Sequence, residues 1–184
     1  TNLSLFLFDM TFNSKTISGL TSLLLSHKLR SLQSLSLNFD LCRSLSNSVM
    51  TKIAESICQS LLNLHRFELI LSPPTSSSGK SILKSVKALF DIEGITDSGL
   101  VQFGRTLSKG NLALEDIHLS IKGGLQVSDK GVRKFFDKIG MMKKLNKINV
   151  RFEGYGFKVT DETRKEVREK FKYLKQAKIE MHNF

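Results

Sequence analysis

The 184-residue sequence has no tryptophan, only two prolines and only two cysteines. Cys42 and Cys58 lack the spacing of a metal site, and so little cysteine is typical of a reducing compartment, which predicts a cytoplasmic location. There is also no run of about 18 apolar residues, so the sequence predicts no membrane-spanning helix. These shortages exclude a disulfide-stapled secreted module, a zinc-binding module and a chain that crosses a membrane through a helix.

Carboxylates are also scarce, because 17 Asp and Glu face 28 Lys and Arg and leave a net charge of +11. The excess is uneven. Residues 1–60 carry a net charge of +2, residues 61–121 are neutral, and residues 122–184 carry +9. Any acidic partner is therefore expected to prefer the C-terminal third.

A short apolar pattern recurs along the whole chain. In each copy an apolar residue is followed by another two positions later, and often preceded by one three positions earlier. The copies align on Leu3, Leu35, Phe67, Ile117, Ile148 and Ala177, with steps of 32, 32, 50, 31 and 29 residues. A near-constant period of about 30 residues predicts stacked units, each with one strand.

Apolar residues at helical spacing lie between these strands, as in Val49, Ile53 and Ile57. Three of the helices begin alike, with Ile95-Thr96-Asp97-Ser98-Gly99, Val127-Ser128-Asp129-Lys130-Gly131 and Val159-Thr160-Asp161-Glu162-Thr163. The Thr or Ser hydroxyl is expected to cap the helix by accepting a bond from a free N–H, and the Asp faces the positive helix end. Helices that join successive strands predict a parallel sheet.

One unit is irregular. Residues 72–81 hold both prolines and a run of serines, which predicts a loop. Residues 82–90 fit two interpretations. As a strand, Leu83, Val86, Ala88 and Phe90 match the recurring pattern; as a helix, Ile82, Leu83, Val86, Leu89 and Phe90 share one face. The strand is the favoured interpretation.

The Leu-x-x-Leu-x-Leu strands, followed by Ile-Thr-Asp-Ser-Gly-Leu or Val-Ser-Asp-Lys-Gly-Val helix starts, resemble leucine-rich repeat proteins of the ribonuclease-inhibitor type. The resemblance is strongest over residues 95–152 and suggests degenerate repeats like those of large protist proteins. It implies an α/β solenoid with a curved parallel sheet on the concave side and helices on the convex side. Residues 1–184 would form one such domain of six or seven repeats, and we expect it to be a fragment of a longer chain.

No motif points to catalysis. The four histidines lie about a repeat or more apart, and none has a partner at metal-ligand spacing. Ser78-Gly-Lys-Ser81 ends like a phosphate-binding loop, but Pro74 stands where that motif needs its first glycine. The sequence therefore predicts no enzyme, catalytic residue, metal, cofactor or small-molecule substrate.

Function is expected in the side chains between the strand leucines, which would line the concave face and are not needed for packing. The candidates for partner binding are Arg66, Glu68, Asp116, His118, Lys147, Asn149, Arg151 and Lys178. They predict a non-enzymatic protein–protein interaction scaffold, a structural subunit of a larger assembly whose partner has an acidic surface. Acidic cytoskeletal polymers such as microtubules fit this charge. The alternative is binding of nucleic acid or another polyanion through residues 122–184.

Overall fold

The computed structural model describes residues 1–40, 42, 46–72, 94–110, 113–123, 125–154 and 157–183. Strands and helices alternate along these residues. The elements in chain order are β1 (Asn2–Phe6), α1 (Ser14–Leu24), the short 3-10 helix η1 (His27–Leu29), β2 (Ser34–Asp40), α2 (Asn47–Ser60), β3 (Arg66–Ser72), β4 (Ile95–Thr96), α4 (Asp97–Lys109), β5 (Asp116–Lys122), β6 (Leu125–Gln126), α5 (Asp129–Ile139), β7 (Lys147–Gly154), α6 (Asp161–Lys170) and β8 (Gln176–Asn183). None of the helices among these residues is both long and apolar enough to span a membrane.

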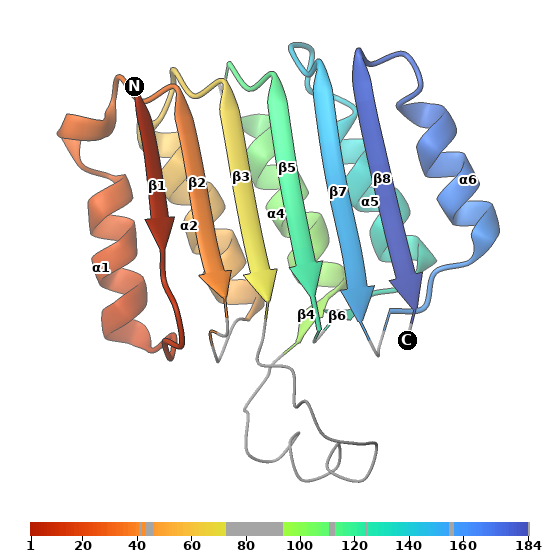
Figure 1. Cartoon of the computed structure of the whole chain (residues 1–184), viewed down its shortest axis with the longest axis horizontal. Helices are drawn as coiled ribbons and strands as arrows, with labels where there is room; N and C mark the ends of the chain where they lie inside the picture. Colours follow the sequence, from red (N-terminus) through yellow and green to blue (C-terminus); the bar gives the residue numbers. More distant parts are fainter. Residues whose placement is uncertain are drawn as a thin grey trace, which may run out of the picture.

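The main sheet has six parallel strands in the order β1-β2-β3-β5-β7-β8, and β4 pairs with β6 in a small second sheet. The helices lie together on one face of the main sheet (Figure 1). Neighbouring strands follow chain order, so each connection leaves the sheet, passes through a helix on that face and returns beside the strand it left. The fold is α/β, as the sequence predicts.

The strand register confirms the alignment of the recurring pattern. The six aligned residues pair across the sheet in the order Leu3↔Leu35↔Phe67↔Ile117↔Ile148↔Ala177. The long step of 50 residues also keeps this register, because Phe67 pairs directly with Ile117. Ser72, the first residue of the expected loop at 72–81, instead ends β3. The rest of that loop, and the strand or helix expected at 82–90, lie outside the described residues.

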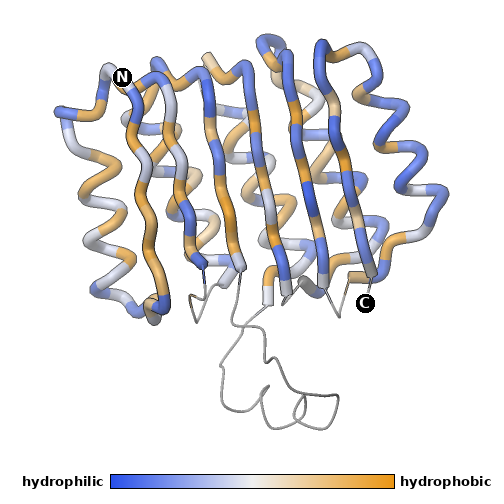
Figure 2. The backbone as a smooth tube through the Cα atoms, in the orientation of Figure 1, coloured by the Kyte–Doolittle hydropathy of each residue, from blue (hydrophilic) through white to orange (hydrophobic). Residues whose placement is uncertain are grey.

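Alternate strand residues form the core. On β2, Leu35, Leu37 and Phe39 are fully buried against the helices, while the residues between them are half-buried on the other face. A strand has a side-chain period of two, so one strand supplies both faces; Figure 2 shows the resulting alternation of colour along the strands. Phenylalanine rings pack against one another between neighbouring units. The ring centroid of Phe136 lies 6.3 Å from that of Phe152 and 5.5 Å from that of Phe171.

The predicted helix starts are confirmed, but two of the expected capping bonds are wrong. Thr96, Ser128 and Thr160 are the N-caps of α4, α5 and α6. Of the hydroxyls of these three residues, only that of Thr160 accepts a bond from a backbone N–H of its own helix, that of Thr163 at 3.3 Å. The hydroxyls of Thr96 and Ser128 make no such bond, because both are engaged by the preceding helix.

A side chain from the preceding helix contacts each of these N-caps. Asp97, the first residue of α4, accepts from the backbone N–H of Ser128 at 2.7 Å and from its hydroxyl at 2.6 Å. The contact recurs, and we term the three pairs Asn47–Thr96, Asp97–Ser128 and Asp129–Thr160 the cap ladder. Hydrogen bonds to a charged acceptor contribute about 1.5–3 kcal/mol each, so the ladder ties each helix to the next.

Two glycines make room for the cap ladder. A Cβ at Gly99 would lie 1.8 Å from the Oδ1 atom of Asn47, and a Cβ at Gly131 would lie 2.1 Å from Oδ1 of Asp97. Any larger residue would occupy the space of the incoming side chain. In α6 the corresponding residue is Thr163, which is fully buried and contributes a hydroxyl bond to Asp129.

Replacing Gly131 by alanine is expected to lower the free energy of unfolding by about 1–3 kcal/mol, because the added methyl group overlaps Asp97. Urea titration followed by circular dichroism measures the change. Gly19→Ala in α1 is the matched control, since no atom lies within 4 Å of the added Cβ. Alanine has the higher helix propensity, so this control should gain about 0.5–1 kcal/mol. Equal changes in the two variants would contradict the role of Gly131.

Asp129 should make stability depend on pH in the acidic range. Burial acts to raise its pKa, but bonds from the backbone N–H of Thr160 and from the hydroxyls of Thr163 and Thr160, with the charge of Arg133, outweigh burial and lower the pKa below 3.8. A carboxylate whose folded-state pKa is lowered stabilises the fold above its unfolded pKa, and this contribution is lost as the pH falls through the folded value.

Asp129→Asn keeps the shape and removes the charge, so it should be less stable than the wild type at neutral pH. The difference between the two should shrink as the pH falls below about 3.8. Urea titrations of both proteins over a pH series measure this. A difference that stays constant, or grows, toward low pH would show that the charge of Asp129 contributes nothing.

Candidate functional site

The face of the main sheet opposite the helices is left uncovered by the described elements (Figure 1), and we term it the strand face. Its side chains form rows, because the strands are in register. Three of the rows run across all six strands: Asn2, Ser34, Arg66, Asp116, Lys147 and Gln176; Ser4, Ser36, Glu68, His118, Asn149 and Lys178; and Phe6, Asn38, Ile70, Ser120, Arg151 and Glu180.

The structure brings the eight predicted site residues together on this face. They come from four strands: Arg66 and Glu68 from β3, Asp116 and His118 from β5, Lys147, Asn149 and Arg151 from β7, and Lys178 from β8. Each is exposed or half-buried. Their placement follows from strand periodicity alone, since they alternate with the buried apolar residues.

Glu68 is the centre of a polar cluster in the middle row. Its carboxylate accepts a bond from the hydroxyl of Ser36 at 2.7 Å, and its other oxygen lies 2.7 Å from Nδ1 of His118. The carboxylate therefore stands between serine and histidine. In nucleophilic catalysis the histidine must lie beside the serine to take its proton, so this order does not activate the hydroxyl. The cluster orders the face instead.

Carboxylates neutralise most of the cations on β7 and β8. Arg151 lies 2.5 Å from Glu153 and 3.9 Å from Glu180, and the ammonium of Lys178 lies 3.1 Å from Glu180. The hydrogen bond from Lys178 is the main reason that the pKa of Glu180 is lowered. Lys147 makes no ion pair with any described residue. The rise in positive charge expected along the strand face is therefore largely cancelled.

Two exposed phenylalanines lie on or near the N-terminal end of the strand face, and the sequence prediction did not include them. Phe6 is 73% exposed and Phe8 is 64% exposed. Asn38 lies in register between Phe6 and Ile70, and its buried Oδ1 atom has no hydrogen-bond partner among the described residues. The signal was present in the sequence, because Phe6 falls between Leu5 and Leu7, at the outward phase of the strand.

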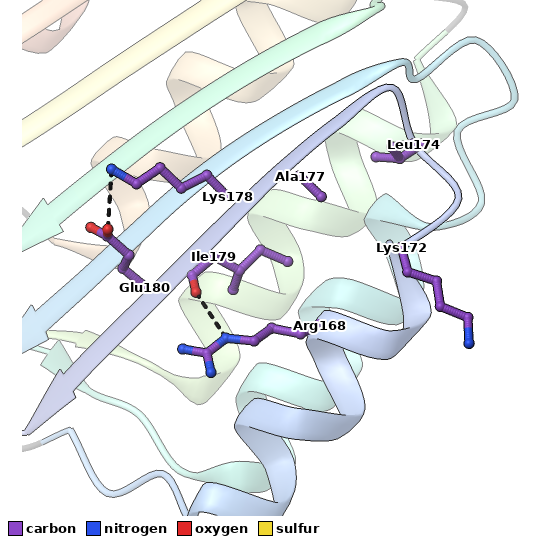
Figure 3. A pocket seen from close by; sticks show the side chains of 7 residues that line it. All are labelled: Arg168, Lys172, Leu174, Ala177, Lys178, Ile179 and Glu180. Carbon is purple, nitrogen blue, oxygen red and sulfur yellow. Dashed lines mark hydrogen bonds and ion pairs between the residues drawn. The ribbon is translucent and has the colours of Figure 1, made fainter.

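A hollow of about 490 Å³ lies at the edge of the sheet between α6 and β8 (Figure 3). Its apolar part comes from Leu174, Ala177 and Ile179, and Arg168 from α6 donates to the backbone carbonyl of Ile179 at 3.2 Å. In Figure 3 the charged ends of Lys178 and Glu180 point toward each other and away from Arg168. The hollow offers a surface for apolar contact, and Glu180, the one carboxylate among its lining residues, is already paired with Lys178 at 3.1 Å.

Neither cysteine has the environment of a reactive thiol. Cys42 donates to the backbone carbonyl of Leu7 and Cys58 to that of Thr106. Burial raises the pKa of both thiols; with a contribution from the charge of Glu55, the pKa of Cys58 reaches about 11. Across the described ranges, no three His, Cys, Asp or Glu side chains gather as metal ligands.

Comparison with known proteins adds little to this geometry. No family model matches the chain, and no curated protein matches it. The chain is similar to a structural-genomics crystal structure of a protein from Bacteroides fragilis, with 19% identity and a TM-score of 0.37. The match covers 83% of this chain and 42% of that one, so the chain spans less than half of the other protein's length. A likeness at this TM-score carries no argument.

Cys58 is expected to react slowly with a thiol reagent in the folded protein, because at a pKa of about 11 its thiolate is scarce at pH 8. Ellman's reagent at pH 8 measures the rate, and Cys42→Ala isolates the Cys58 signal. In urea the same thiol should react at least about a hundredfold faster, since its ordinary pKa is near 8.5. Equal rates in the folded and unfolded protein would contradict the raised pKa.

Proposed function

We propose that this chain is a leucine-rich repeat module of the ribonuclease-inhibitor type, a solenoid whose sheet is the concave side. Its function is to serve as a non-enzymatic scaffold that binds another protein through the strand face. The parallel strands in chain order, the helices on one face and the recurrent helix starts support the repeat assignment. A cytoplasmic structural subunit, associated with the cytoskeleton or a similar assembly, fits this role.

The observation that carries the proposal is a set of ordered side chains on a face of the sheet that no described element covers (Figure 1). Neighbouring strands hold the side chains of the strand face in place, as Glu68 is held by Ser36 and His118. Such side chains lose little conformational entropy when a partner binds, which favours recognition. The ammonium of Lys147, which has no ion-pair partner among the described residues, and the exposed ring of Phe6 fit a partner that offers both a carboxylate and an apolar contact.

The alternative, nucleic-acid binding through residues 122–184, would use a different surface. On the strand face, Arg151 and Lys178 are matched by Glu153 and Glu180, so apart from Lys147 most of the remaining excess lies on the helices and loops. The two functions are therefore separable by the position of a mutation.

A photo-crosslinking residue placed at Asn149, in the middle of the strand face, should capture a discrete partner protein in an extract of cells that express the chain. The same residue at Lys134, exposed on α5, is the control for non-specific capture. Mass spectrometry identifies the captured protein. Capture from position 134 and not from position 149 would place the interface on the helices and refute the proposal.

Lys147→Glu should then lower the yield of the crosslink from position 149 by about three- to tenfold, because it reverses a charge that a complementary partner must meet. Lys134→Glu makes the same charge change on the helix face and should leave the yield unaltered. Arg151 is left intact, since its removal would leave the buried Glu153 without its closest cation. If both variants lowered the crosslink yield equally, the effect would come from the net charge of the protein and not from the position of Lys147.

A further inference from the structure

A large part of the positive charge of the C-terminal third that has no ion-pair partner among the described residues lies at two loops at the amino ends of the strands. One loop leads from α5 into β7 and the other from α6 into β8, at the upper edge of Figure 1. They are neighbours because β7 and β8 begin side by side, with Lys147 paired to Gln176. We term residues 138–147 and 170–178 the lysine rim.

The lysine rim contains eight lysines and no Asp or Glu. Three of these lysines are paired with nearby carboxylates: Lys170 with Asp137, Lys172 with Glu169 and Lys178 with Glu180. The exposed side chains of Lys143, Lys144 and Lys175 make no ion pair with any residue that the structure describes. Positive charge without a partner among the described residues therefore remains at this edge of the molecule, where a carboxylate on the side of β5, that of Glu115, accepts from Asn146 at 3.5 Å.

Exposed apolar side chains lie among these lysines. Met141 is 66% exposed and Tyr173 is 67% exposed, one in each loop of the lysine rim. Leu62, after α2, and Leu25, after α1, are 49% and 41% exposed on the corresponding loops farther along the same edge. Single exposed apolar residues are normal, but here four of the five helix-to-strand loops along this edge each present one. Because the strands are parallel and in register, this edge can meet a flat surface at several points.

We infer that the lysine rim binds the surface of a bilayer that contains anionic phospholipid. The lysines attract the headgroups, and each cation held near such a surface raises the binding constant about fivefold. Tyr173 and Met141 enter the interfacial layer, where tyrosine is favoured because its ring is apolar and its hydroxyl remains hydrated. The two features together explain why the loops carry both charge and apolar surface.

The composition of the rim favours a membrane over nucleic acid. Its cations are all lysines, which act as point charges, whereas arginine suits the bidentate recognition of a fixed phosphate. Only Tyr173 offers a ring for stacking on a base, and exposed Met141 has no role in such a complex. Lipid headgroups move laterally and so adapt to a cluster of point charges.

This inference goes beyond the proposed scaffold function and does not depend on it. Lys147, Gln176 and Lys178 belong to both surfaces, but the rest of the lysine rim is an edge formed by loops and helix ends, whereas the strand face is a face of the sheet. Further strands beside β8 would extend the sheet sideways and leave the rim exposed. A protein bound to the strand face could therefore be held at a membrane.

Sedimentation with vesicles tests the inference. The whole chain is mixed with vesicles of phosphatidylcholine alone, or of phosphatidylcholine with phosphatidylserine, and the bound fraction is measured. We expect binding only to the second kind, falling as salt increases. Lys143→Glu with Lys144→Glu should weaken this binding by at least about twentyfold. Lys130→Glu with Lys134→Glu, at exposed positions of α5, is the control of equal net charge and should lose far less.

The apolar contribution is tested by Met141→Ser with Tyr173→Ser, which leaves the charge unchanged. Vesicle binding should weaken by about fivefold, while binding to duplex DNA, followed by fluorescence anisotropy at the same salt, should not change. The inference is overturned if the Lys143/Lys144 variant and its Lys130/Lys134 control lose vesicle binding equally. A wild type that binds vesicles with and without phosphatidylserine to the same extent would also overturn it. It is also overturned if the serine variant binds vesicles like wild type, which would identify a general polyanion site.

Discussion

Burial of every second strand residue against the helices is the constraint on which the rest of this structure depends. Leu35, Leu37 and Phe39 show it on β2, where all three are excluded from solvent. Because every second residue of a strand is buried in the core, the residues between them point to the other face and are not needed for packing. The register then sets these residues of different strands side by side, which is how Ser36, Glu68 and His118 come to form one cluster. The core and the candidate site thus have a single cause.

The direction of the chain adds an electrostatic order. The described crossover helices run antiparallel to the strands (Figure 1), so their positive ends lie at one edge of the sheet and their negative ends at the other. Asp97 and Asp129 occupy the first edge, within the cap ladder. Lys138 and Lys170 occupy the second, where a cation near a helix C-terminus gains about 0.3–1 kcal/mol. The lysine rim therefore lies where the fold itself tolerates cations best.

The sequence was sufficient for the parts of the structure that rest on local periodicity. The register followed from the Leu-x-Leu pattern, and Thr96, Ser128 and Thr160 were recognisable as helix caps. What could not be foreseen depends on contacts between units. The partner of Asp97 lies 31 residues away, and the charge of Arg151 is cancelled by Glu180 on the next strand. Pairings of this kind require the register to be combined with side-chain reach. The outward position of Phe6 could have been predicted, because Phe6 lies between Leu5 and Leu7.

The cap ladder also bears on whether the units are interchangeable parts. The α5 unit can pair with a neighbour at both ends. Gly131 leaves room for the Asp97 side chain of the preceding unit, and Asp129 accepts a hydrogen bond from the backbone N–H of Thr160 in the following unit. A tandem array copied from this unit would fit itself at every junction. An array copied from the α6 unit would not fit in this way. Thr163 occupies the space that a glycine leaves open in α5, and Asp161 forms an ion pair with Arg164 of its own helix. A few atoms at the helix ends thus set the order in which the units can be joined.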